Sequence, residues 1–176
     1  MSTTKIKLSD EKKRSSPRKT ISSWLIEHPN VNPYKFTWDA LYRKMTNKFR
    51  ILPSFLIIGA AKSGTTSLYA HLIEHPNIIP ASMKEVQFFQ YLRNTKTSFY
   101  RSHFPIKKKN LITGEATASY FPHPFVPARV HKLLPLVKLI VILRNPVERA
   151  YSSFHYKVKL GEQIAENFED AIKAEL

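Results

Sequence analysis

Blocks of apolar and polar residues alternate along the chain from residue 51 onward, and they predict strands and helices in turn. Two short apolar runs indicate strands, at residues 55–59 (FLIIG) and 137–144 (VKLIVILR), and the mixed segment 111–116 (LITGEA) is a further candidate strand. Continuous apolar runs of this length are typical of strands in a parallel sheet whose two faces are both covered. The run at 137–144 is the clearest buried strand in the pattern.

Helical patterns fill the segments between and after these runs. They cover residues 65–75, 127–135, 145–160 and 167–176. Pro76 and Pro135 end the first two patterns, and Asn145 followed by Pro146 is a favourable start for the third, because these residues suit the N-cap and the first turn. Strands alternating with helices predict an α/β fold, with a central parallel sheet flanked by helices in three layers.

The N-terminal region differs in composition, which divides the chain into three predicted parts. Residues 1–22 are polar and basic, so we expect a mobile tail, either a solvated terminus or an arm that binds nucleic acid or membrane. Residues 23–50 are rich in aromatic side chains, and helical spacing between Trp38 and Met45 predicts a helical extension packed on the main domain. That domain is expected to cover residues 51–176.

Charge and composition narrow the choice of partners. The chain has 28 Lys and Arg against 13 Asp and Glu, a net charge of +15, and +10 of it falls after residue 20. This excess favours polyanionic partners: nucleotides, nucleic acid, acidic glycans or anionic membranes. The absence of cysteine excludes a disulfide framework and a thiolate site. No signal-peptide pattern and no apolar run near the roughly 20 residues of a membrane span are present, which predicts a soluble cytoplasmic protein.

A glycine-containing loop joins the run at 55–59 to the helical pattern at 65–75, and its pattern is that of a P-loop-like phosphate site. Gly59 and Gly64 satisfy G-x-x-x-x-G, and Lys62 lies between them. The backbone N–H groups of such a loop, together with the positive end of the following helix, bind anions. Further hydroxyl donors are available from the residues Ser63, Thr65, Thr66 and Ser67.

The position of Lys62 distinguishes this loop from the P-loop of ATPases and GTPases. Those loops need Lys-Ser/Thr directly after the second glycine, to reach the terminal phosphates and to hold magnesium. Here Thr65 and Thr66 follow Gly64, so the pattern that holds magnesium in those loops is not matched. An ordinary strand-to-helix turn is the alternative, and the lysine with four hydroxyl residues argues against it.

A second motif, LIVILRNPVERAYSSF at residues 139–154, places Arg144 at the carboxyl end of a predicted strand, where α/β folds bind ligands. Ser152 follows about two helical turns later. Arg144 suits bidentate contact with a phosphate, and Ser152 can donate one more hydrogen bond. The alternative is an Arg144 that pairs with Glu148 and a Ser152 that is simply exposed.

Together the two motifs resemble those of the sulfotransferases that use 3′-phosphoadenosine 5′-phosphosulfate (PAPS). GAAKSGTTSL resembles the family's 5′-phosphosulfate loop, and LRNPVERAYSSF resembles its 3′-phosphate motif. The segments HPNIIPASMKEVQFF and GEATASYF are similar to the heparan-sulfate and related glycan branch, although Ala116 stands where that branch often has lysine. The resemblance extends from about Phe55 to the C-terminus.

The resemblance implies that a sulfuryl group passes from PAPS to a hydroxyl or amine of an acceptor, with 3′-phosphoadenosine 5′-phosphate (PAP) as product and no metal. Glu85 would be the base, Lys62 would stabilise the leaving phosphate, and Arg144 with Ser152 would bind the 3′-phosphate. The rest of the donor loop would be Ser63, Gly64, Thr65, Thr66 and Ser67. A glycan or another small alcohol is the expected acceptor, with no role for nucleic acid.

The helical pattern at 167–176 has no stop signal after it, which fits either a frayed C-terminal helix or a truncated domain. Sulfotransferase domains normally continue further, so the resemblance favours truncation. We therefore predict weak or no activity from these 176 residues alone.

Other interpretations stay open on the residues alone. Glu85 could be a surface carboxylate paired with Lys84, and a histidine could replace it as base, although none of the histidines at 71, 75, 123 and 155 lies in a context that matches such a role. A P-loop kinase or NTPase, or a basic nucleic-acid-binding module, are the alternative functions. Binding of PAP without magnesium would separate them.

Overall fold

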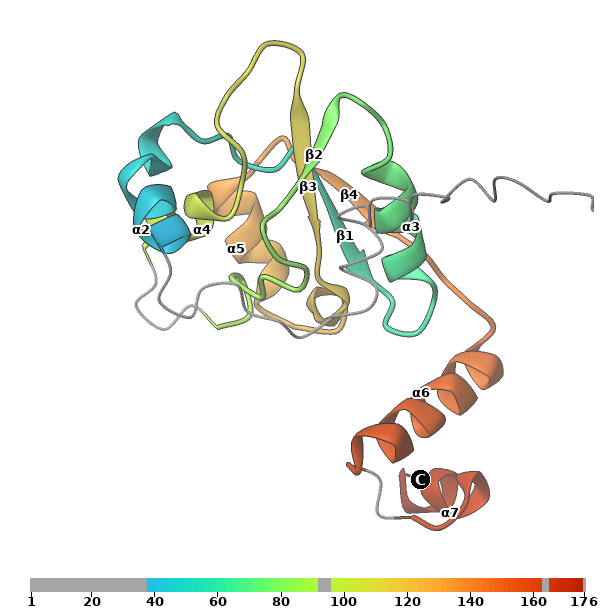
Figure 1. Cartoon of the computed structure of the whole chain (residues 1–176). Coiled ribbons are helices and arrows are strands. Elements are labelled where there is room, and N and C mark those ends of the chain that lie inside the picture. The colour runs from blue at the N-terminus through green and yellow to red at the C-terminus, as the bar shows by residue number, and fades with distance from the viewer. Residues whose placement is uncertain (1–37, 92–95, 163–164, 176) are drawn as a thin grey trace, which may run out of the picture.

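The computed structural model (Figure 1) describes residues 38–91, 96–162 and 165–175, and its centre is a four-stranded parallel sheet. The strands are β1 (Phe55–Gly59), β2 (Ile78–Pro80), β3 (Ile112–Ala116) and β4 (Lys138–Val141). Their order across the sheet is β2-β3-β1-β4, and every neighbouring pair is parallel. The carboxyl ends of the strands therefore meet at one edge, which is the edge where α/β folds bind ligands.

Helices cover both faces of this sheet, as the alternation in the sequence predicts. The described helices are α2 (Trp38–Met45), α3 (Thr65–Leu72), α4 (Thr97–Ser102), α5 (Val126–Leu133), α6 (Pro146–Leu160) and α7 (Phe168–Glu175), with the short 3₁₀ helices η1 (Asn47–Phe49) and η2 (Ala118–Tyr120). Of these, α6 and α7 extend away from the sheet (Figure 1). Figure 1 shows α4 and α5 on one face and α3 on the other, with α2 outside α4. The predicted three-layer α/β class is confirmed. No helix in the described part of the chain has the length and apolar content to cross a membrane.

Two apolar cores join the layers, and β1 contributes to both. On the α4–α5 face, Leu56 packs in a buried cluster with Phe89 and Tyr100. On the α3 face, Phe55 and Ile57 belong to a second buried cluster. Complete burial of an apolar side chain of this size contributes about 1.5–3 kcal/mol. β1 is therefore the strand that anchors the sheet.

β4 does not match the prediction of a buried strand. It is shorter than the run at 137–144, and it lies at the edge of the sheet with β1 as its single neighbour among the described strands. Leu139 is 55% exposed, and Val141 is exposed as well. The prediction was wrong because an apolar run shows only that a strand can be buried. Burial also needs neighbouring elements on both sides of the strand, and among the described strands β4 has a neighbour on one side.

The helix predicted in the N-terminal extension is present as α2, which contacts α4 and η1. The predicted tail at residues 1–22 and the segment 23–37 lie outside the described residues. Two elements, β2 and α4, were not predicted. The start of α6 is as expected, because the Asn145 side chain accepts hydrogen bonds from the backbone N–H groups of the first turn and Pro146 is the first helical residue.

Candidate active site

The loop between β1 and α3 has the backbone geometry of an anion site. Gly64 precedes the first residue of α3 and has φ +93°, and Lys62 also has a positive φ of 66°. Gly64 supplies no capping side chain, so the first N–H groups of α3 have no partner within the helix. Unpaired N–H groups at a helix N-terminus attract negative charge. The open end of α3 therefore faces whatever the loop binds.

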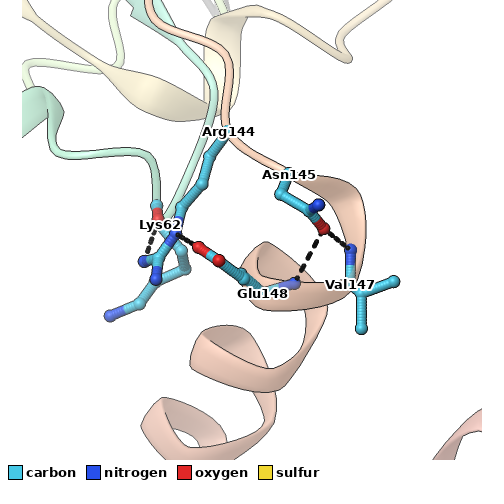
Figure 2. Close-up of polar contacts among 5 residues, drawn as sticks. All are labelled: Lys62, Arg144, Asn145, Val147 and Glu148. Atoms are coloured by element: carbon cyan, nitrogen blue, oxygen red, sulfur yellow. Dashed lines mark hydrogen bonds and ion pairs between the residues drawn. The ribbon is translucent and has the colours of Figure 1, made fainter.

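Figure 2 shows how the two sequence motifs come together at this loop. The Nη1 atom of Arg144 donates a hydrogen bond to the backbone carbonyl of Lys62 at 3.4 Å, across 82 residues of sequence. The Nε atom of Arg144 contacts Glu148 Oε2 at 3.1 Å. The side chain of Arg144 thus lies between the loop and α6. The pairing with Glu148 that was expected as an alternative is present together with the contact to the loop.

The ion pair between Arg144 and Glu148 is open to solvent, and exposed pairs of this kind contribute little to stability. An incoming phosphate can therefore replace the carboxylate at small cost. Arg144 would then make the stronger charge-assisted contacts that a guanidinium forms with phosphate. Ser152 is half-buried on α6.

The ammonium group of Lys62 lies 4.0 Å from the centre of the Tyr156 ring on α6. A cation above an aromatic face is attracted by the ring, and among the described residues no carboxylate forms an ion pair with Lys62. Tyr156 was not predicted as part of the site. Tyr156 lies about three helical turns after Arg144, on the helix that follows it, and this spacing was the sequence signal that could have indicated its place in the site.

The hydroxyl residues of the loop have different surroundings. Thr65 is buried, and Ser67 is exposed. The Ser63 hydroxyl oxygen is buried without a hydrogen-bond partner in the described part of the chain. The Thr66 hydroxyl accepts a hydrogen bond from the Lys84 side chain. The buried Ser63 hydroxyl therefore has unused hydrogen-bonding capacity among the described residues.

Glu85 lies at the carboxyl end of β3. Its backbone N–H donates to the Ala116 carbonyl at 3.0 Å, and its φ of 58° places it in the left-handed region, which is unusual for a residue other than glycine. Burial raises the pKa of the Glu85 carboxyl, while the charge of Lys84 and a backbone hydrogen bond from Ala118 oppose the rise. A carboxylate with a raised pKa is better matched to accept a proton near neutral pH.

Lys84 links Glu85 to the loop, whereas it was expected only as a possible surface partner of Glu85. Its side chain is only 9% exposed, donates to Thr66 and lies 3.8 Å from Glu85 Oε1. Burial lowers the pKa of Lys84; Glu85 opposes this shift, and Lys62 adds to it. The base candidate and the loop are therefore electrostatically coupled through this lysine.

A second carboxyl, Glu115, is completely buried on β3 one residue before Ala116. Burial raises its pKa to about 8, and the hydroxyls of Tyr120 and Tyr100 oppose the rise. Even so, neither carboxyl oxygen has a hydrogen bond of ordinary geometry within the described residues. Burial therefore favours the protonated form of Glu115 near neutral pH. It was not predicted as a titratable part of this region, because sequence does not show which glutamate is buried.

Among the described residues, no group of three or more His, Cys, Asp or Glu side chains could hold a metal ion. The histidines at 71, 75 and 155 are exposed, and His123 is half-buried. The expectation of a metal-free site stays a prediction.

Comparison with known proteins places the site in context. A family model described as a sulfotransferase domain matches residues 52–176. The chain is 41% identical over 122 residues to bifunctional heparan sulfate N-deacetylase/N-sulfotransferase 1 of Caenorhabditis elegans, covering 65% of this chain and 14% of that protein. It is 38% identical over 116 residues to the membrane-associated sulfotransferase kil1 of Dictyostelium discoideum, covering 64% of this chain and 24% of that protein.

A solved structure, that of a sulfotransferase from Alicyclobacillus acidocaldarius, is similar with a TM-score of 0.60 and 28% identity, covering 68% of this chain and 55% of that one. The chain therefore spans about half of this solved structure, and between 14% and 24% of the two curated relatives.

Proposed function

The chain belongs to the sulfotransferase family, and from this membership we propose that it moves a sulfuryl group from PAPS to a hydroxyl or amine of an acceptor. The observation that carries the proposal is the hydrogen bond from Arg144 to the Lys62 carbonyl. It sets the side chain proposed for the 3′-phosphate beside the loop proposed for the 5′-phosphosulfate. These are the two anionic ends of one cofactor, joined through a single ribose.

In this proposal the loop stabilises charge on the leaving group. The open N–H groups of α3 and the ammonium of Lys62 would bind the phosphosulfate, together with Ser63, Thr65, Thr66 and Ser67 of the loop. Negative charge develops on the bridging oxygen as the bond from sulfur to that oxygen breaks. Preorganised donors aimed at developing charge are commonly the largest contribution to catalysis.

Glu85 takes the acceptor proton. The acceptor oxygen or nitrogen forms its bond to sulfur, its proton passes to the Glu85 carboxylate, and PAP leaves with the electron pair of the broken bond. The raised pKa of Glu85 supports this role, because a base with a pKa nearer to neutrality holds the proton more strongly. Arg144 and Ser152 orient the donor without taking part in bond making.

We propose a glycan as the acceptor. The support is the heparan sulfate named for the first relative, together with the net charge of +10 after residue 20, which favours an acidic partner. The word N-sulfotransferase in that name makes a glycan amine the first acceptor to test. The cytoplasmic location stays a prediction.

The test of donor binding is calorimetric titration with PAP in the presence of EDTA. We expect PAP to bind, and adenosine 5′-phosphate, which lacks the 3′-phosphate, to bind at least about tenfold more weakly, since hydrogen bonds to a charged group contribute about 1.5–3 kcal/mol. Lys62→Ala should weaken PAP binding, while Lys132→Ala, a matched change on the exposed surface of α5, should not. Binding of magnesium–ATP without PAP would instead identify a kinase or NTPase, and binding of nucleic acid alone would exclude both enzymes.

Transfer is tested separately with PAPS and heparan sulfate whose amines are free. We expect slow transfer of sulfate to the glycan, in keeping with the weak activity predicted for these 176 residues alone, and no transfer to the same glycan with acetylated amines if the acceptor is an amine. Transfer to an acceptor of another class but to no glycan would leave the family assignment intact and overturn the proposed acceptor.

A further inference from the structure

The outer layer of the α4 face is a continuous surface built from two segments, residues 41–52 and 96–110, which we call the α2–α4 face. The segments are joined by backbone hydrogen bonds from Lys107 to Phe49 at 2.8 Å and from Ile51 to Pro105 at 3.0 Å. The Arg50 side chain adds a bond to the Phe104 carbonyl at 2.6 Å. Because α2, η1 and α4 all contact one another, their outward side chains belong to one surface.

This face has one sign of charge. The two segments contain nine basic residues and no aspartate or glutamate: Arg43, Lys44, Lys48, Arg50, Lys96, Arg101, Lys107, Lys108 and Lys109. All six lysines are exposed, whereas Arg50 is buried and used in the fold. A surface this rich in basic residues attracts polyanions, which favours a role in recognition over a role in stability.

Large apolar side chains are exposed on the same face. Met45 is 74% exposed and Phe49 is 68% exposed, and the further members are Leu41, Tyr42 and Phe99. Single exposed apolar residues are ordinary, but a group of them on adjoining elements marks an interaction site. Lysines interspersed with exposed leucine, methionine and aromatic residues are the pattern of a surface that lies in a membrane interface.

An open cavity of about 670 Å³ lies between the two segments. Four basic residues line it, Lys48, Arg50, Arg101 and Lys107, and apolar side chains that include Phe49 and Ile106 complete its wall. A cavity with basic and apolar walls suits a lipid headgroup phosphate with the start of its acyl chains.

We propose that the α2–α4 face docks on an anionic lipid bilayer. The exposed lysines contact the headgroups, the cavity takes one anionic headgroup, and Met45 with Phe49 enters the boundary of the acyl chains. A bilayer fits better than a glycan or a nucleic acid, because only a bilayer removes methionine and leucine side chains from water while it neutralises the lysines.

Docking in this way leaves the proposed donor site free. Figure 1 shows α2 and α4 on the side of the sheet away from α3, whereas the loop with Lys62 opens at the carboxyl edge beside the start of α6. The proposal therefore does not depend on the proposed function, and either can fail without the other.

The test is cosedimentation of the full chain with vesicles of phosphatidylcholine, with and without phosphatidylserine. We expect binding only to the vesicles that contain phosphatidylserine. The variant K107Q/K108Q/K109Q should bind about ten- to a hundredfold more weakly, since each lysine near an anionic surface contributes about 1 kcal/mol. A matched variant with three exposed lysines changed elsewhere, K132Q/K157Q/K159Q, should bind nearly as the parent does. The basic residues of 1–20 are the same in every variant, so the difference reports on the face.

A second pair of variants tests the apolar contribution. M45Q/F49Q should reduce binding and should leave the salt dependence unchanged, whereas L136Q, at an exposed leucine outside the face, should have no effect. Circular dichroism and PAP titration on each variant separate loss of folding from loss of docking. Equal binding to both kinds of vesicle, equal loss in the two lysine variants, or binding of heparin or RNA but not of vesicles would overturn the proposal.

Discussion

The two strands beside β1, β3 and β4, differ in burial, and the less apolar of the two is the more buried. β4 (KLIV) is the more apolar strand, yet it is an edge strand with mostly exposed side chains. β3 (ITGEA) contains a glutamate and a threonine, yet four of its five residues are buried. One register row shows the contrast directly, because Glu115 on β3 pairs with Leu56, and Leu56 pairs with Leu139 on β4.

The position of a strand in the sheet decides whether its side chains are buried, and an apolar composition only makes that burial possible. β3 has a strand on each side and core on its face, so even Glu115 is enclosed. β4 has one neighbour among the described strands, and at this edge the Leu139 side chain is left uncovered, so it stays more than half exposed. The carboxyl ends of the two strands also lie beside residues with different proposed roles. Glu85, the proposed base, follows β2 in sequence and lies beside the end of β3, and Arg144, proposed to bind the 3′-phosphate, follows β4. Each prediction below tests one side of this contrast.

The largest expected effect is at the end of β3. Glu85→Gln keeps the shape of the side chain and removes its ability to take a proton, so turnover of PAPS with a glycan amine should fall by about 10²–10⁴-fold. PAP affinity should change little, because Glu85 is not proposed to hold the donor. Turnover within a few-fold of the parent would remove Glu85 as the base and leave the end of β3 without a catalytic role.

Burial along the register row gives the next largest effect. Leu56→Ala should lower the free energy of unfolding by about 2–5 kcal/mol, because it leaves a cavity in a packed core. Leu139→Ala, the same change one strand away, should cost less than about 1 kcal/mol because Leu139 is already half exposed. Chemical denaturation of the two variants measures the difference. Similar losses would mean that β4 is as buried as β3.

The buried carboxyl on β3 predicts a dependence of stability on pH. The pKa of Glu115 is about 8 in the fold and near 4.5 when unfolded, so between these pH values the unfolded chain releases a proton that the fold retains. The free energy of unfolding should therefore fall as pH rises, by on the order of 1 kcal/mol per pH unit, and level off above pH 8. Glu115→Gln should remove this slope. The same slope in the variant and the parent would assign it to other groups.

Local signals in the sequence predicted much of this architecture. The glycines around Lys62 and the Asn145–Pro146 pair marked a loop and a helix start through backbone preferences that do not depend on the rest of the fold. The three-residue β2 and the polar α4 have too little hydrophobic periodicity to be predicted, since a helix or strand is recognised in sequence from periodicity over longer windows.

The surroundings of individual side chains were not predictable. Because the carboxyl ends of parallel strands meet at one edge, Arg144 after β4 was expected near the ligand-binding edge of the sheet. It contacts the loop between β1 and α3 there. Nothing local indicated that Lys84 would bridge Thr66 and Glu85, or that Glu115 would be enclosed, because both depend on which elements pack over them. Strand order, a property of the whole sheet, was the missing information in each case.

The smallest expected effect is at the end of β4, where Arg144→Ala should change binding and not stability. PAP affinity should fall by about ten- to a hundredfold, since a charge-assisted contact contributes about 1.5–3 kcal/mol, whereas adenosine 5′-phosphate should bind the variant and the parent alike. The free energy of unfolding should stay within about 0.5 kcal/mol, because the pair with Glu148 is exposed.

Glu148→Gln is the control that separates the two partners of Arg144. It removes the ion pair and leaves the guanidinium free for phosphate, so PAP affinity should be unchanged or slightly higher. If both variants instead weakened PAP and adenosine 5′-phosphate equally, Arg144 would act by holding the start of α6 against the loop. β4 would then serve the site only by positioning a helix, and the contrast with β3 would lie in stability alone.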